Sequence, residues 1–149
     1  MADLIIFLLL LGLGYGAGSW AEKRHYQLIG KREKQFLNLP ALTAKKLVMD
    51  EQLVERAILV SGSAVISIDY FKRLLAGLRN IFGGTVKSYE SLIDRARREA
   101  ILRMKENAHG ASMIVNVRIE TSTIGKNAVK GKVGSVEALA YGTAITMKP

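Results

Sequence analysis

An uncharged apolar run near the amino terminus, from Leu4 to Trp20, most constrains what this chain can fold into. Its length of about seventeen residues is at the short end of what crosses the hydrocarbon core of a bilayer as a helix. A secretory signal would carry positive charge before the run, but only Asp3 precedes it closely and no Lys or Arg lies upstream. We therefore predict an uncleaved transmembrane anchor over residues 1–20, with Trp20 at the membrane interface.

The basic residues follow this run, and they are Lys23, Arg24, Lys31, Arg32 and Lys34. By the positive-inside rule they keep the following chain on the cytoplasmic side. We expect a single pass through the inner (cytoplasmic) membrane, with the N-terminus outside and a soluble domain in the cytoplasm. Residues 21–40 have two open interpretations, a helix bound to anionic lipid head groups or a plain solvated linker. Pro40 ends this segment.

Four glycines alternate inside the apolar run: Gly12, Gly14, Gly16 and Gly18. They form two overlapping small-xxx-small spacings, which allow two membrane helices to approach closely. Glycine is also simply common in membrane helices, so a role in transmembrane packing and a neutral role both remain open.

Two helices separated by a glycine pair are predicted in the centre of residues 41–149, the single domain that the remaining length allows. Apolar residues recur at helical spacing from Phe71 to Phe82, and Gly83-Gly84 ends that helix. A second helix runs from about Tyr89 to Ala108, with Asp94–Arg98 and Glu99–Arg103 as favourable four-residue pairs on its charged side. We expect the sheet to pack on this long helix.

Three segments read as strands. Ala57 to Ser67 is apolar and β-branched in both alternating phases, which predicts burial on two sides. Met113 to Thr121 alternates as a half-buried strand does. Val136 to Met147 places Leu139, Tyr141, Ile145 and Met147 on one face and Ala138, Ala140 and Ala144 on the other. We expect one face on the domain's own helices and the flat alanine face against a neighbouring subunit, which predicts a homo-oligomer.

The central motif resembles the YbjQ-like family. The matching residues are Gly77-Leu78-Arg79-Asn80-Ile81-Phe82-Gly83-Gly84, Tyr89-Glu90, Ala96-Arg97, Ala100, Met104, Gly110-Ala111 and Ala140-Tyr141-Gly142-Thr143-Ala144. The resemblance implies an α+β fold, YbjQ/dodecin-like, with a small antiparallel sheet packed on a helical pair. It also implies assembly as a five-fold ring and carries a heavy-metal-binding label, but no known reaction.

The residues for most site chemistries are missing from the sequence. It has no cysteine, which excludes thiolate catalysis and thiolate metal sites, and no P-loop or histidine pair at metal-ligand spacing. Of the two histidines, His25 lies beside the anchor and His109 follows the long helix, where capping is the favoured role. We predict no cofactor, no catalytic residues and no metal site in one subunit, with His109 as a weak metal candidate between subunits.

Five residues are candidates for a ligand site or a subunit interface: Arg79, Asn80, Glu90, Arg97 and Tyr141. Arg79 and Asn80 suit either an anion or the backbone of the glycine turn. Glu90 and Arg97 lie seven residues apart on similar sides of the second helix, where pairing across subunits is favoured over catalysis.

These patterns predict a membrane-anchored homo-oligomeric module, a pentameric ring by resemblance, that binds or scaffolds and is not an enzyme. The net charge of +9 raises an alternative, a nucleic-acid or anionic-ligand binder that uses the basic loop residues Lys126, Lys130 and Lys132. Nucleic acid is disfavoured because no aromatic stacking platform accompanies these lysines. Weak metal binding, as the family label suggests, is the second alternative.

Overall fold

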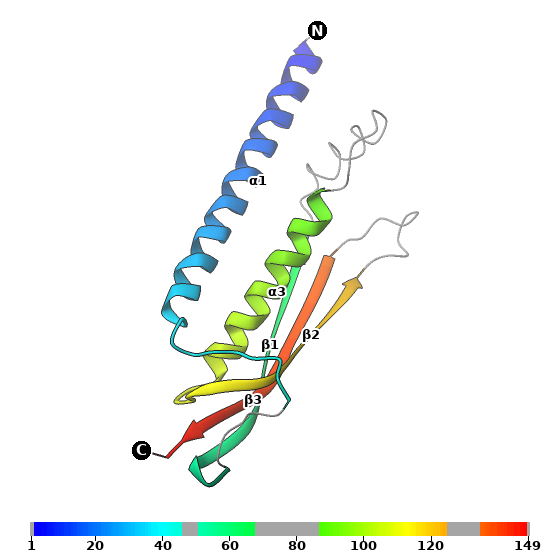
Figure 1. The fold of residues 1–149 in the computed structure, drawn as a ribbon. Coiled ribbons are helices and arrows are strands. Elements are labelled where there is room, and N and C mark those ends of the chain that lie inside the picture. Colours follow the sequence, from blue (N-terminus) through cyan, green and yellow to red (C-terminus); the bar gives the residue numbers. More distant parts are fainter. Residues whose placement is uncertain (1, 46–50, 68–86, 125–134, 149) are drawn as a thin grey trace.

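The computed structural model describes residues 2–45, 51–67, 87–124 and 135–148. In these ranges the elements are α1 (Ala2–Gln35), the 3₁₀ turn η1 (Glu51–Leu53), β1 (Val54–Ser67), α3 (Lys87–Asn107), β2 (Met113–Ile124) and β3 (Ser135–Met147). Three layers result: the sheet, then α3 across one of its faces, then α1 alongside α3 (Figure 1). This α+β arrangement with an antiparallel sheet confirms the predicted fold class in its broad outline.

The sheet has three strands in the order β1-β3-β2, with β3 antiparallel to both neighbours. The β2–β3 register shifts between Val115 and Arg118, where Asn116 takes a positive φ of 52°. Beside this irregularity the chain following Pro40 runs along β2, and the amide of Leu42 donates to the Ile114 carbonyl oxygen at 2.8 Å. The start of the domain predicted over residues 41–149 is therefore hydrogen-bonded to the edge of the sheet.

The core lies between the sheet and α3, as expected for the long helix. Small side chains meet there, because Ala96 and Ala100 of α3 and Ala138 and Ala140 of β3 are all fully buried. A Cβ on Gly62 would lie 2.5 Å from the Ala100 carbonyl oxygen, well inside van der Waals contact. The α3 backbone thus rests directly on β1, and only glycine fits at that point.

One prediction about strand faces was wrong. In β1 one face is buried within the chain, since Val60 and Ala64 point toward α3 while Leu59 and Val65 remain 78% and 55% exposed, so burial of its second face stays a prediction. In β3 the alanine face packs on α3 and not on a neighbour, because Ala140 is 0% exposed. Both strands carry apolar residues in both phases, so the sequence could not tell which phase meets the helix. A charge at Ala140 would therefore disrupt the core before it reported on any subunit contact.

The amino-terminal segments form one continuous helix of 34 residues. The predicted boundary between the anchor and the basic segment is not a break in the chain's structure, because α1 passes through both segments. The helix ends at Gln35, five residues before Pro40. The predicted helix of residues 71–82, the first of the helical pair, lies outside the described residues.

The close approach at Gly62 gives a test of the core. We expect Gly62→Ala to lower the free energy of unfolding by about 1–3 kcal/mol, toward the upper end because the methyl group meets backbone that cannot rotate away. Denaturant unfolding of the full-length protein in detergent measures this. Gly30→Ala is the matched control, because a Cβ at Gly30 of α1 meets nothing within 4 Å. Equal losses for the two variants would contradict the described packing.

Candidate functional site

The contact between α1 and α3 is the most elaborate polar assembly among the described residues. Its apolar centre is Ile29, which is 1% exposed although it lies on a helix whose amino-terminal half is open. The helices run parallel, since Tyr26 contacts Ser91 near one end and Phe36 contacts Lys105 near the other. The carboxy-terminal half of α1 is therefore part of the folded domain.

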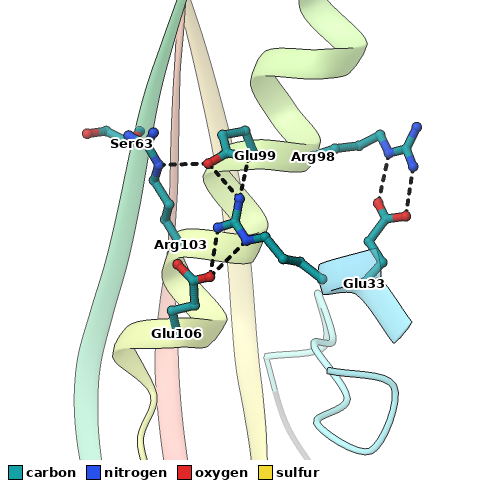
Figure 2. A network of polar contacts seen from close by, with 7 residues as sticks. Glu33, Ser63, Arg98, Glu99, Arg103 and Glu106 are labelled. Carbon is teal, nitrogen blue, oxygen red and sulfur yellow. Dashed lines mark hydrogen bonds and ion pairs between the residues drawn. The ribbon is translucent and has the colours of Figure 1, made fainter. Parts of the chain in front are cut away.

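Arg32 of α1 inserts its guanidinium group between two carboxylates of α3. Its Nη1 donates to both oxygens of Glu99 at 2.9 and 2.8 Å, and its Nη2 donates to Oε1 of Glu106 at 2.7 Å. Arg103 reaches Glu99 from the other side at 3.0 Å and also donates to the Ser63 carbonyl oxygen of β1 (Figure 2). One buried carboxylate thus links all three layers.

A second pair lies on the opposite flank of the contact. Arg98 donates two parallel hydrogen bonds to the carboxylate of Glu33, at 2.8 and 2.7 Å (Figure 2). This bidentate geometry is the strongest that an arginine and a carboxylate adopt. We call Arg32, Glu33, Arg98, Glu99 and Glu106 the α1–α3 ion-pair cluster.

An aromatic contact extends the interface toward the start of α3. The Tyr26 hydroxyl donates to the Ser91 carbonyl oxygen at 3.2 Å. The guanidinium carbons of Arg95 and Arg98 lie 5.8 and 5.7 Å from the centre of the Tyr26 ring, within cation–π range. Contacts between α1 and α3 therefore occur at several positions along both helices.

The electrostatics of Glu99 follow from this geometry. Burial acts to raise the pKa of Glu99, but the hydrogen bonds and charges of Arg32 and Arg103 outweigh burial and leave that pKa below its ordinary value. Burial lowers the pKa of Lys105, whose ammonium group donates to the Phe36 carbonyl oxygen at 3.1 Å. Glu99 is therefore ionised at neutral pH, and α1 supplies one of the cations that allow its burial.

A second feature is the side of the sheet away from α3, where exposed apolar side chains stand among polar ones. We call it the outer sheet face, and its residues in the two paired strands β1 and β3 include Leu59, Ser61, Ser63, Val65, Glu137, Leu139, Tyr141 and Thr143. Leu59 is 78% exposed and Leu139 is 39% exposed. No described element covers these two leucines, which is costly for a surface in water.

The apolar half of α1 is exposed in the same way. Among the described residues α1 is the one helix long and apolar enough to cross a membrane, a test that signal sequences near an N-terminus also pass. The predicted packing glycines of this half are partly open, because a Cβ at Gly12 or Gly16 meets nothing within 4 Å. Packing of these glycines, with Gly14 and Gly18, against another helix stays a prediction.

The other predicted site residues are scattered. Glu90 and Arg97 lie exposed on α3 away from the ion-pair cluster, and Tyr141 lies half-buried on the outer sheet face opposite Ser61. His109 is exposed just past α3, and no group of three or more metal-ligating side chains occurs in the described part of the chain. The remaining candidates, Arg79, Asn80, Lys126, Lys130 and Lys132, lie outside the described residues.

Sequence reasoning found only part of the ion-pair cluster. The Glu99–Arg103 and Asp94–Arg98 pairs within α3 are confirmed, at 3.0 and 3.6 Å. The sequence does not reveal the partners on α1, because Arg32 follows the apolar run among other cations that suit lipid head groups equally well. The available signal was weak, because Glu99 lies at the border between the apolar and the charged side of α3 and its burial could not be recognised without α1.

A family model described as "Putative heavy-metal-binding" matches residues 41–148. The chain belongs to the YbjQ-like family. A protein of Hahella chejuensis from the UPF0145 group is 37% identical over 109 residues, which cover 72% of this chain and 98% of the relative. One from Archaeoglobus fulgidus is 36% identical over the same length, covering 94% of that relative. A solved structure of unknown function from Pediococcus pentosaceus is similar over 74% of this chain, with 16% identity and a TM-score of 0.42.

The YbjQ-like match begins at residue 41, so α1 lies outside it. Each match covers almost the whole length of the relative, but it leaves more than a quarter of this chain unmatched. Helix α1 and its two residues of the ion-pair cluster, Arg32 and Glu33, thus lie outside the family match.

Loss of the Arg32 guanidinium group tests the cluster. We expect Arg32→Ala to reduce the free energy of unfolding by about 2 kcal/mol, because it removes charge-assisted hydrogen bonds from the buried Glu99. Lys31→Ala, at the exposed neighbouring position, is the control and should change stability by less than about 0.5 kcal/mol. Chemical denaturation at neutral pH, read by the circular dichroism of the helices, compares the two.

The same comparison has a pH signature. Because the folded pKa of Glu99 is lowered, its contribution to stability is full above the ordinary value of 4.5 and is lost as the pH falls through the lowered value. The stability difference between wild type and Arg32→Ala should therefore shrink on acidification. A difference that does not change between pH 7 and pH 3 would contradict the described pairing.

Proposed function

We propose that this protein is a membrane-anchored homo-oligomeric module that binds or scaffolds other molecules and has no catalytic activity of its own. The observation that carries this proposal is the coexistence of two uncovered apolar surfaces, the amino-terminal half of α1 and the outer sheet face. Each calls for a partner, and the two surfaces call for different ones. A lipid bilayer suits the uncharged helix, and a protein surface suits the sheet.

The bilayer is the proposed partner of Leu4 to Trp20. The exposed apolar side chains of this segment surround the helix, since the consecutive residues Leu4, Ile5, Ile6 and Phe7 all remain open. The cations that follow it support a single pass through the inner membrane, with the N-terminus outside and the domain in the cytoplasm. Exposed Lys23 and Arg24 suit anionic lipid head groups.

Further copies of the domain are the proposed partners of the outer sheet face. Leu59 and Val65 of β1 and Leu139 of β3 are exposed apolar side chains on this face, with Tyr141 among them. A closed ring would bury these side chains in every copy, and five copies are proposed from the family resemblance. The same contacts would leave the α1–α3 layer free for a ligand or another protein.

Metal binding is the alternative that the family description suggests. In this chain it would need His109 or carboxylates gathered from several copies, because the sequence has no cysteine and the described residues form no metal-ligating cluster. The anionic-ligand alternative depends on Lys126, Lys130 and Lys132, which lie outside the described residues. The proposal therefore rests on the apolar surfaces and not on either alternative.

Disruption of the outer sheet face tests assembly. We expect Leu59→Asp to lower the molar mass of the detergent-solubilised protein to that of a smaller species, because the carboxylate would be buried unpaired between copies. Light scattering after size exclusion measures the mass. Thr123→Asp, an exposed β2 position outside this surface, is the control and should keep the wild-type mass. If Leu59→Asp also keeps the wild-type mass, the outer sheet face does not join copies.

A further inference from the structure

We propose that the domain stands upright on the bilayer, with the amino end of α3 held at the lipid head groups by the α1–α3 ion-pair cluster. This inference rests on the proposed function in one respect, that Leu4 to Trp20 crosses the membrane. It adds an orientation, a rigid connection and a lipid-facing surface. Its physical basis is the way α1 passes from the apolar segment into the domain.

Continuity of α1 is the first step. The helix is unbroken from Ala2 to Gln35, so the apolar segment and the part that packs on α3 share one axis (Figure 1). A linker between anchor and domain would let the domain rotate freely. A continuous helix transmits its direction, so the tilt of the membrane segment sets the tilt of the domain.

The level of α3 relative to the membrane is the second step. Tyr26 is beside Ser91, and α3 begins four residues before Ser91, roughly 6 Å nearer the membrane end. Trp20 is six residues before Tyr26, roughly 9 Å in the same direction. The first turn of α3 therefore lies within about one helical turn of the point where the apolar segment ends.

Rigidity is the third step. Contacts between the parallel helices occur from Tyr26–Ser91, through Glu33–Arg98 and Arg32–Glu99, to Phe36–Lys105. Contacts at several levels fix the angle between two helices, whereas a single contact would act as a pivot. Glu99 also reaches the sheet through Arg103 and the Ser63 carbonyl oxygen, so the sheet is included in the rigid unit.

The sheet has a defined orientation in this arrangement. Ser61 accepts a hydrogen bond from Asn107 and Ser63 accepts one from Arg103, so β1 runs antiparallel to α3. Ser67 at the end of β1 and Ser135 at the start of β3, whose hydroxyl oxygens lie 3.0 Å apart, are therefore at the membrane end. The outer sheet face then stands along the membrane normal. Copies joined through it would keep all their anchors in one bilayer.

The chemistry of the membrane end fits anionic lipid. Lys23 and Arg24 are exposed at this level, and the Arg24 guanidinium carbon lies 5.4 Å from the centre of the Trp20 ring. Tryptophan with a neighbouring cation is typical of the head-group region. The amino end of α3 faces the same way. The surface is thus assigned to phospholipid head groups.

Fluorescence energy transfer in vesicles tests the orientation, and the absence of native cysteine allows single labels. The full-length protein would carry Glu90→Cys near the start of α3 or His109→Cys beyond its end, both at exposed positions. These sites are separated by roughly 25 Å along the helix axis. A donor dye is attached to the introduced cysteine. The protein is placed in vesicles of phosphatidylcholine and phosphatidylglycerol in which some lipids carry an acceptor dye on the head group. We expect several-fold higher transfer per acceptor from position 90 than from position 109.

The outcomes separate this inference from the proposed function. Arg32→Ala combined with Arg98→Ala should bring the two transfer efficiencies together while the protein still floats with the vesicles, and Lys31→Ala should leave them apart. Equal efficiencies in the otherwise unchanged protein, with flotation intact, would overturn the upright orientation but not the anchor. Failure to float would overturn the anchor, and the orientation with it.

Discussion

The pairing of Glu99 with Arg32 is the interaction on which the rest of this structure depends. A carboxylate buried on the α3 surface is costly unless cations and hydrogen-bond donors surround it. Arg103, one turn further along α3, supplies one cation and Arg32 of α1 supplies the other. The requirement of one buried charge thus turns an otherwise separate apolar helix into a layer of the domain.

Helix α3 occupies the centre because its two sides are built differently. Toward the sheet it presents Ala96, Ala100 and Met104, and small residues let its backbone reach Gly62. Toward α1 it presents Glu99 and Arg98, which make hydrogen bonds of fixed geometry. The sheet side determines how tightly the domain packs, and the α1 side determines how the domain is held relative to the amino-terminal helix. Family membership accounts for the first side only, because the family match begins after α1.

Much of the fold could be predicted from sequence because local patterns determine it. The alternation of β2 from Val117 to Glu120, the helical spacing of α3 and the Glu99–Arg103 pair all depend on neighbours close in the chain, and all three are present. The irregularity at Asn116, beside which Ile114 and Val115 are both buried, was not predicted. Contacts between segments far apart in the chain were harder to predict. The sequence did not reveal which alternating set of residues in β1 and β3 faces α3, because both sets contain apolar residues. The partner of Arg32 was missed because a lipid phosphate and a glutamate attract a guanidinium group in the same way, and only the fold brings Glu99 within reach.

Hydrogen exchange of the backbone amides in detergent-solubilised full-length protein tests the central claim most directly, namely that α1 enters the domain as a docked helix. If the α1–α3 contact holds, amides of residues 22–35 should exchange slowly, with protection comparable to that of α3. Glu99→Gln should then reduce the protection of residues 22–35 while leaving β3 protected. If residues 22–35 of the wild-type protein exchange as fast as a solvated linker while α3 and β3 remain protected, α1 is not docked on α3 and the central role of Glu99 is contradicted.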